Sequence, residues 1–140
     1  MISVGAVLDA VLVHVLLREA LEPALRDVVA TGAPMPDVRD DDWAADADTA
    51  SAMLWSRDGS GAGIQVRMSA PEPDRVAQVA DQVQEFVIEE LARLGATNWP
   101  VCPRHPTTHP MEAASEDGVA VWVCPADAIP VSSIGTLTST

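Results

Sequence analysis

The stretch Trp99-Pro-Val-Cys-Pro-Arg-His-Pro-Thr-Thr-His-Pro-Met-Glu-Ala-Ala-Ser-Glu-Asp-Gly-Val-Ala-Val-Trp-Val-Cys-Pro-Ala-Asp127 contains both cysteines of the chain and two of its three histidines. These four residues are Cys102, His105, His109 and Cys124. Thiolate and imidazole are the ligands that Zn²⁺ prefers, and four of them complete a tetrahedron without an open position for substrate. The stretch therefore predicts a structural zinc site that holds the C-terminal part of the chain together.

The spacing within this stretch is typical of a zinc ribbon. Cys102-Pro-Arg-His105 places two ligands on one tight turn, because proline fixes the φ angle that such a turn needs. Val119–Val123 has the composition of a β-strand and ends at the second knuckle, Cys124-Pro125. Asp117-Gly118, just before it, is a strong hairpin-turn signal. We expect a knuckle, a loop and a hairpin that brings the second knuckle to the same metal.

The identity of the fourth ligand is open between two residues. Asp127 stands where a Cys-Pro-x-Cys knuckle would carry its second cysteine. His109 is the better chemical choice, because structural zinc binds imidazole far more often than carboxylate. The predicted metal ligands are therefore Cys102, His105, His109 and Cys124.

Other uses of the two cysteines are less well supported. A Cys102–Cys124 disulfide implies export, and the sequence has no secretion signal. Two unpaired thiols would leave both prolyl knuckles unexplained. A catalytic zinc is also disfavoured: the deaminase signature needs H-x-E before P-C-x-x-C, but here the first cysteine knuckle comes before His109, and no HExxH sequence occurs.

Composition limits the range of partners. The chain has 140 residues, of which 48% are hydrophobic, so it can bury a real core. Its net charge is −13, with 21 acidic residues against eight basic ones, all of them arginine. A field of one sign repels phosphate backbones and anionic lipid. We therefore expect protein partners, in a homo- or hetero-oligomer, and neither sequence-specific nucleic-acid binding nor membrane binding.

The N-terminal segment resembles a targeting signal only superficially. Val4–Leu17 is almost wholly apolar, but Asp9 and His14 interrupt it, and it is too short to span a bilayer. No positive charge precedes Arg18, whereas a signal peptide needs a cationic start. These features predict a cytoplasmic protein, or a virion protein if a phage encodes it.

Two segments have helical periodicity. In the first, residues 4–29, apolar side chains recur every three or four positions; Pro23 should kink this helix or start a second one at Glu22. His14 lies on its apolar face, which favours a packed core histidine. The second helix should begin at Pro73 or Asp74 and run to residue 94, before Gly95.

The segment between these helices should contain an acidic loop and a hairpin. Residues 37–48 carry six aspartates around Trp43, which either pins this loop to the body or anchors a partner. Residues 52–56 and 64–68 read as strands joined by the glycine-rich turn 57–63. The predicted fold class is α+β, with two long helices packed with a β-hairpin. The predicted units are a helix–hairpin–helix unit, residues 1–95, and a zinc-ribbon-like β unit, residues 96–140.

The C-terminal part also resembles a known group of proteins. Trp99–Pro110, Val119–Pro125 and Ile134–Leu137 are similar to small uncharacterised zinc-ribbon-like proteins of actinobacteria and their tailed phages. The resemblance does not extend to the first 95 residues. It implies a zinc-stabilised module built on Cys102, His105, His109 and Cys124, with no established catalytic activity. Asp127 is a departure, because an ordinary ribbon has a second cysteine there.

These observations favour a non-enzymatic structural or assembly protein with a structural Zn²⁺, as a subunit of a larger complex. The resemblance to phage proteins suggests a head–tail connection or tail-completion component of a virion, in which an acidic ring would let DNA pass without binding it. The alternative is a cytoplasmic protein-binding or regulatory zinc-ribbon module of an actinobacterium. A zinc enzyme ranks last, since no acid–base pair, nucleophile or cofactor loop is evident in the sequence.

Overall fold

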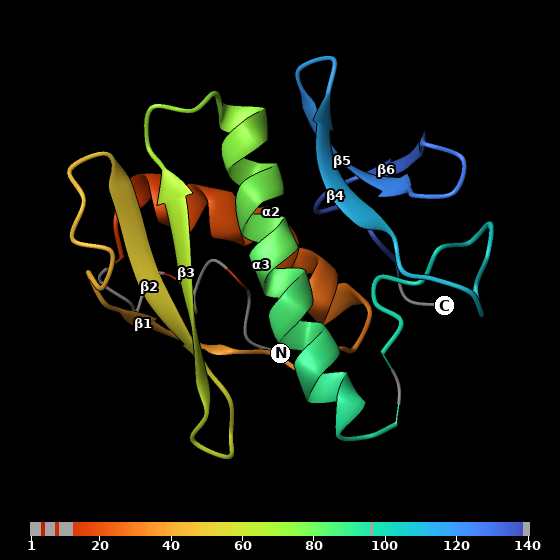
Figure 1. Cartoon of the computed structure of the whole chain (residues 1–140), viewed down its shortest axis with the longest axis horizontal. Coiled ribbons are helices and arrows are strands. Elements are labelled where there is room, and N and C mark those ends of the chain that lie inside the picture. The colour runs from red at the N-terminus through yellow and green to blue at the C-terminus, as the bar shows by residue number, and fades with distance from the viewer. Residues whose placement is uncertain (1–3, 5–7, 9–12, 96, 139–140) are drawn as a thin grey trace.

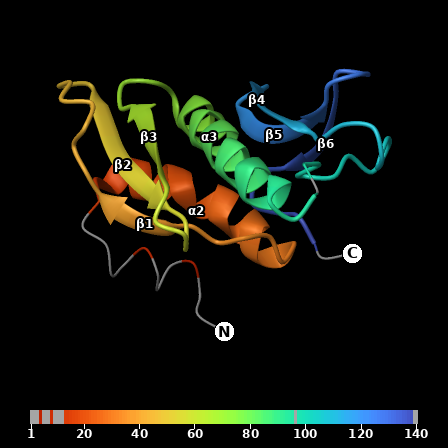
Figure 2. The same cartoon turned by 60° about the horizontal axis from the view of Figure 1, so that its bottom comes forward.

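The computed structural model describes residues 4, 8, 13–95 and 97–138. Two helices lie between two antiparallel three-stranded sheets, one from each half of the chain (Figure 1), and a second view shows the same arrangement (Figure 2). The predicted α+β class is confirmed. The elements are α2 (Val15–Ala30), β1 (Asp37–Asp40), β2 (Thr49–Trp55), β3 (Gly61–Arg67), α3 (Glu72–Ala92), β4 (Glu112–Glu116), β5 (Val119–Cys124) and β6 (Ile129–Ser133).

The first sheet contains the predicted hairpin and one further strand. β2 and β3 pair antiparallel, with Ala52 opposite Ile64, and the turn between them includes Gly59 at a φ of 92°. β1 pairs with the other edge of β2, although its residues belong to the predicted acidic loop. Only Val38 of β1 is buried, with 1% of its surface exposed. One inward apolar residue among charged ones is a weak strand signal, which is why the sequence pattern did not reveal β1.

The first helix differs from its prediction at its start. α2 begins at Val15. His14 precedes it with φ −56° and ψ 139°, which is an extended conformation, so the helix does not continue toward residue 13. His14 is exposed, and its Nδ1 accepts a hydrogen bond from the Leu16 N–H at 3.1 Å. The predicted core histidine is therefore wrong, because this side chain caps the helix instead. Residues 5–7 and 9–12 of the predicted helix lie outside the described residues.

The interior of α2 also corrects one expectation. Pro23 lies inside the helix, which continues to Ala30 as a single element. The predicted start of a second helix at Glu22 is thus wrong. Leu17, Leu21, Leu25 and Val28 are fully buried, so packing of the apolar face holds the helix together despite the proline.

The second helix, α3, follows its prediction closely. It begins at Glu72, has Pro73 in the first turn and ends before Gly95, whose φ is 83°. Its buried face includes one polar residue, Gln84. The Gln84 Nε2 donates hydrogen bonds to the carbonyl oxygens of Trp99, at 3.1 Å, and Met111, at 2.5 Å. These bonds attach α3 to both ends of the segment that carries Cys102, His105 and His109.

A buried carboxylate attaches the C-terminal sheet to α2. Asp27 has no exposed surface, and its side chain accepts hydrogen bonds from Trp122 Nε1 at 2.7 Å, Gly135 N at 2.8 Å and Leu137 N at 2.9 Å. Burial raises the pKa of the Asp27 carboxyl, and the three donated hydrogen bonds oppose this shift. Because the folded-state pKa lies above the unfolded-state pKa, protonation of this carboxyl favours the folded protein. Its contribution to the free energy of unfolding is therefore largest below the unfolded-state pKa and is lost as the pH rises through the folded-state pKa.

Side chains from both predicted units form one buried cluster. The Trp99 and Trp122 rings meet edge to face, with centroids 5.8 Å apart and planes at 78°. Both belong to the core that also contains Leu25 and Val28 of α2 and Val87 of α3. The boundary at residue 95 stays a prediction.

Candidate metal centre

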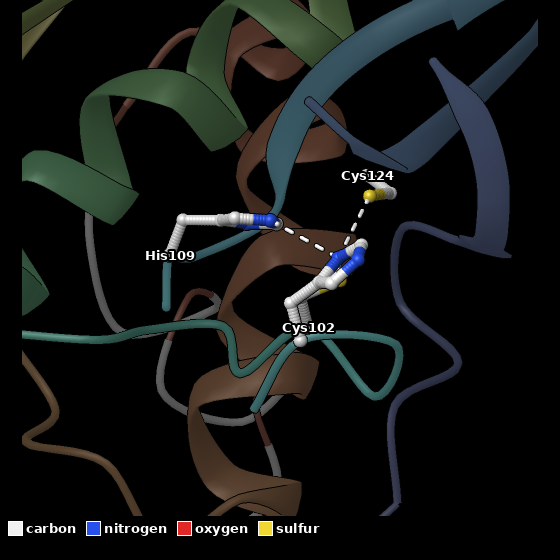
Figure 3. Close-up of side chains that lie close together, drawn as sticks. Cys102, His109 and Cys124 are labelled. Carbon is white, nitrogen blue, oxygen red and sulfur yellow. Dashed lines mark hydrogen bonds between the residues drawn. The ribbon is translucent and has the colours of Figure 1, made fainter. Parts of the chain in front are cut away.

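Four side chains of the C-terminal part converge on one point. One ligand atom from each of Cys102, His105, His109 and Cys124 lies within 4.8 Å of all the others. Figure 3 shows Cys102, His109 and Cys124 pointing toward one another, beside the ribbon of α2. The structure thus brings together the four residues that the sequence singled out.

The separations suit a small tetrahedral metal site. The His105 Nδ1 lies 3.2 Å from His109 Nε2, 3.5 Å from Cys124 Sγ and 4.0 Å from Cys102 Sγ. Zn–N bonds of about 2.0 Å and Zn–S bonds of about 2.3 Å imply ligand–ligand edges of roughly 3.3–3.8 Å in a tetrahedron. Shifts of a few tenths of an ångström would bring these three separations to such edges. The donor set and its geometry therefore fit a Cys₂His₂ metal site.

The first three ligand residues are brought together by a closed loop. His105 N donates to the Cys102 carbonyl at 3.1 Å, which forms the predicted knuckle turn. An antiparallel bridge then joins Val101 to Pro110, and Met111 N donates to the Pro100 carbonyl at 2.9 Å. Because Cys102 and His109 are the neighbours of the bridged pair, closing this loop places both on the same side of the site.

The hairpin of β4 and β5 supplies the fourth residue. Glu112 pairs with Val123, so the ladder leads directly to Met111 on one strand and Cys124 on the other. The turn between the strands has Asp117 at φ 51° and Gly118 at φ 78°, the left-handed pair that a tight hairpin needs. After Cys124 the chain turns again, and Ala128 N donates to the Cys124 carbonyl at 2.8 Å. Strand register therefore decides that Cys124 meets His109.

Burial separates the two kinds of ligand. Cys102 and Cys124 are fully buried, and both are free cysteines in the structure. His105 and His109 are partly buried, with ring centroids 4.9 Å apart. A buried pair of thiols turned toward two imidazoles is an arrangement that a divalent cation would stabilise, because metal binding deprotonates the thiols and neutralises the resulting charge.

Asp127 lies beside the four-residue group and is not a member of it. Its Oδ2 accepts a hydrogen bond from Arg104 Nε at 2.8 Å and lies 3.8 Å from Cys124 Sγ. The hydrogen bond from Arg104 holds the pKa of the Asp127 carboxyl below its usual value. The same oxygen is 4.0 Å from His105 Nε2, the ring nitrogen not turned toward the cluster. A carboxylate near that nitrogen can orient a ligating imidazole, so the geometry favours His109 as the fourth ligand.

Sequence reasoning missed the polar residues that hold this centre against the helices. Asp27 and Gln84 were not singled out, although each interrupts an apolar stripe of its helix. A polar residue in a buried stripe is a signal of a specific buried partner, because its unpaired burial would be costly. The partners, Trp122 for Asp27 and Trp99 with Met111 for Gln84, are far away in the sequence.

No protein-family model, curated protein or solved structure matches this chain. The cluster of two cysteines and two histidines lies in a C-terminal three-stranded β unit, which is consistent with a zinc-ribbon-like site. Among the described residues, no helix has the length and apolar character needed to cross a membrane.

Proposed function

We propose that this chain is a non-enzymatic structural or assembly protein whose C-terminal β unit is stabilised by one zinc ion. The observation that carries the proposal is the convergence of Cys102, His105, His109 and Cys124 within 4.8 Å. Zinc would cross-link the loop before β4 to the end of β5. Its contribution is to folding free energy, which small β units gain readily from structural zinc.

A structural role suits this ligand set better than a catalytic one. Catalytic zinc has three protein ligands and an open position for water or substrate, whereas four protein ligands close the tetrahedron. The two thiolates add negative charge, which lowers the electrophilicity of the metal. The closed set and the buried sulfurs support a non-enzymatic role.

The assembly role in this proposal rests on charge and on the resemblance of the C-terminal segment. A subunit of a virion head–tail connection or of a completed tail would need a compact fold and a surface that does not hold DNA, and the net charge of −13 supports the latter. The second candidate is a cytoplasmic protein-binding module. Partly exposed Trp43 and Trp55 favour this candidate, since tryptophans often anchor protein partners.

Native mass spectrometry with elemental zinc analysis on the untagged protein tests both parts of the proposal. We expect one zinc per chain, retained in an oligomer several times the 14.8 kDa chain mass. A zinc-loaded monomer would support the protein-binding module instead. A folded chain without metal would contradict the structural zinc site.

The choice of His109 over Asp127 gives a separate prediction. Asp127→Ala removes a residue that supports a ligand, which typically lowers metal affinity by about 10–100-fold. His109→Ala removes a ligand itself and should lower the zinc affinity by more. Competition with a chromophoric zinc chelator measures both affinities. A larger loss in Asp127→Ala would assign the carboxylate to the metal and leave His109 outside.

A further inference from the structure

The outer face of the first sheet, turned away from the helices, carries two exposed tryptophans. Ala50, Ala52 and Leu54 of β2 are buried on the inner face, so alternation places Trp55 outward. Trp55 retains 37% of its surface, and Trp43, in the loop after β1, retains 44%. Large exposed aromatic side chains on a flat sheet face are typical of binding surfaces.

Glycines of β3 let both rings lie on the sheet. A Cβ at Gly61 would come within 2.5 Å of a Trp55 ring carbon, and one at Gly63 would come within 2.9 Å of the Trp43 ring. Gly61 and Gly63 are two residues apart and therefore face the same side. The two indoles thus cover neighbouring positions of one strand, which larger side chains would not permit.

Hydrogen bonds fix the Trp43 ring in place. Its Nε1 donates to the Ala52 carbonyl at 3.0 Å, and Ser51 Oγ donates to the Asp41 carbonyl at 2.9 Å, which ties the preceding loop to the sheet. A ring held in this way loses little conformational freedom when a partner stacks on it. The surface is therefore organised before any partner binds.

The charge around these rings identifies the chemistry of the partner. Residues 37–48 carry six aspartates and one arginine, Arg39, which pairs with Asp37 at 2.9 Å. Asp41 and Asp42 are exposed and directly precede Trp43. Arginine matches both features, because its guanidinium stacks on indole and binds carboxylate in a bidentate manner. Lysine lacks the planar fork and binds such sites less well.

We propose that this face, formed by Trp43, Trp55, Asp41 and Asp42, binds an arginine-bearing segment of a partner protein. The proposal names the partner chemistry of the protein-binding candidate, which the exposed Trp43 and Trp55 favour, and rests on that proposed function. It uses residues of the first sheet and not of the metal centre. A negative result in the peptide titration would therefore leave the zinc analysis unaffected, and the reverse also holds, so the two proposals can be distinguished.

The test is a titration of the ¹⁵N-labelled, zinc-loaded chain with a blocked Arg-Gly repeat peptide, followed through the four indole N–H signals. We expect the signals of Trp43 and Trp55 to shift, and those of the buried Trp99 and Trp122 to stay unchanged. A Lys-Gly peptide of equal length should bind about threefold to fivefold more weakly. Equal binding of both peptides, or equal shifts of all four indoles, would overturn the proposal.

Variants separate the surface from general attraction to an acidic protein. Trp55→Ala should weaken binding of the Arg-Gly peptide about threefold to fivefold, the size of one cation–π contact at a partly exposed site. Asp41→Asn with Asp42→Asn should weaken it by a similar factor. Glu85→Gln with Glu89→Gln, on exposed positions of α3, removes the same charge and should have much less effect. An equal loss in this control, or indole signals that broaden with protein concentration alone because a second copy covers the face, would contradict an arginine-bearing partner.

Discussion

Cys124→Ser is expected to release the metal and to unfold the β4–β6 sheet, with a loss of at least about 4 kcal/mol in the free energy of unfolding. Structural zinc contributes about 10 kcal/mol or more to the folding of small zinc domains, and a site that lacks one of its two thiolates binds the metal too weakly to keep it. Cys124 lies at the end of β5 and joins the hairpin to the loop that carries Cys102 and His109. Loss of this ligand therefore separates the two segments.

Hydrogen exchange and chemical denaturation, each with and without a chelator, check this prediction. The chelator should reduce the stability of the wild type to that of Cys124→Ser and leave the variant unchanged. Amide protection should fall in residues 98–137 and persist in α3. Val121→Ala on the same strand is the control: it loses some packing but should keep its zinc and its sensitivity to the chelator. Unchanged protection of the C-terminal sheet in Cys124→Ser would show that the site is not structural.

Asp27→Ala is expected to cost about 4 kcal/mol, although Asp27 is far from the metal ligands in the sequence. The substitution leaves the Trp122 Nε1–H and the N–H groups of Gly135 and Leu137 without their acceptor, and a buried unpaired donor costs about 1–3 kcal/mol. Burial raises the pKa of the carboxyl, so the ionised group has its own cost, which these donors offset. The net effect of the loss is a C-terminal sheet no longer attached to α2.

Urea denaturation monitored by tryptophan fluorescence measures this effect. Asp27→Asn should lose less stability than Asp27→Ala. The amide oxygen can still accept hydrogen bonds from two of the three donors, although the NH₂ group then faces the third. Glu19→Ala, an exposed position on the same helix, removes the same charge and should change stability by less than about 0.5 kcal/mol. If Asp27→Ala resembled Glu19→Ala, the three hydrogen bonds would contribute nothing to docking of the sheet.

Local sequence patterns predicted the elements whose signals are complete within a short window. The apolar stripe of α3, with Pro73 at its start and Gly95 after its end, is such a signal, and so are the alternation of β3 and the Asp117-Gly118 turn. The spacing of Cys102, His105, His109 and Cys124 was equally local, since prolyl knuckles and a hairpin turn are written in adjacent residues.

The errors arose where distant residues decide the outcome. β1 forms because Val38 enters a core built by β2 and the helices, and not because its own composition favours a strand. The helical periodicity of residues 4–29 predicted one continuous helix, but the chain is extended at His14, whose ring caps α2. Pro23 predicted a kink or a second helix start at Glu22; the second start does not occur, because packing of Leu21 and Leu25 outweighs the missing backbone hydrogen bond.

The sequence by itself determined the chemistry of this protein: an acidic α+β chain with a donor set suited to zinc and a helix-and-hairpin pattern. Tertiary structure alone decided which groups meet. Asp127 accepts a hydrogen bond from Arg104 and is not one of the four ligands. Asp27 accepts a hydrogen bond from Trp122, and the rings of Trp43 and Trp55 pack on the glycines of β3. Residue types and short-range spacing fix what a side chain can bind. Contacts between residues far apart in the chain depend on the packing of whole elements, which no local window contains.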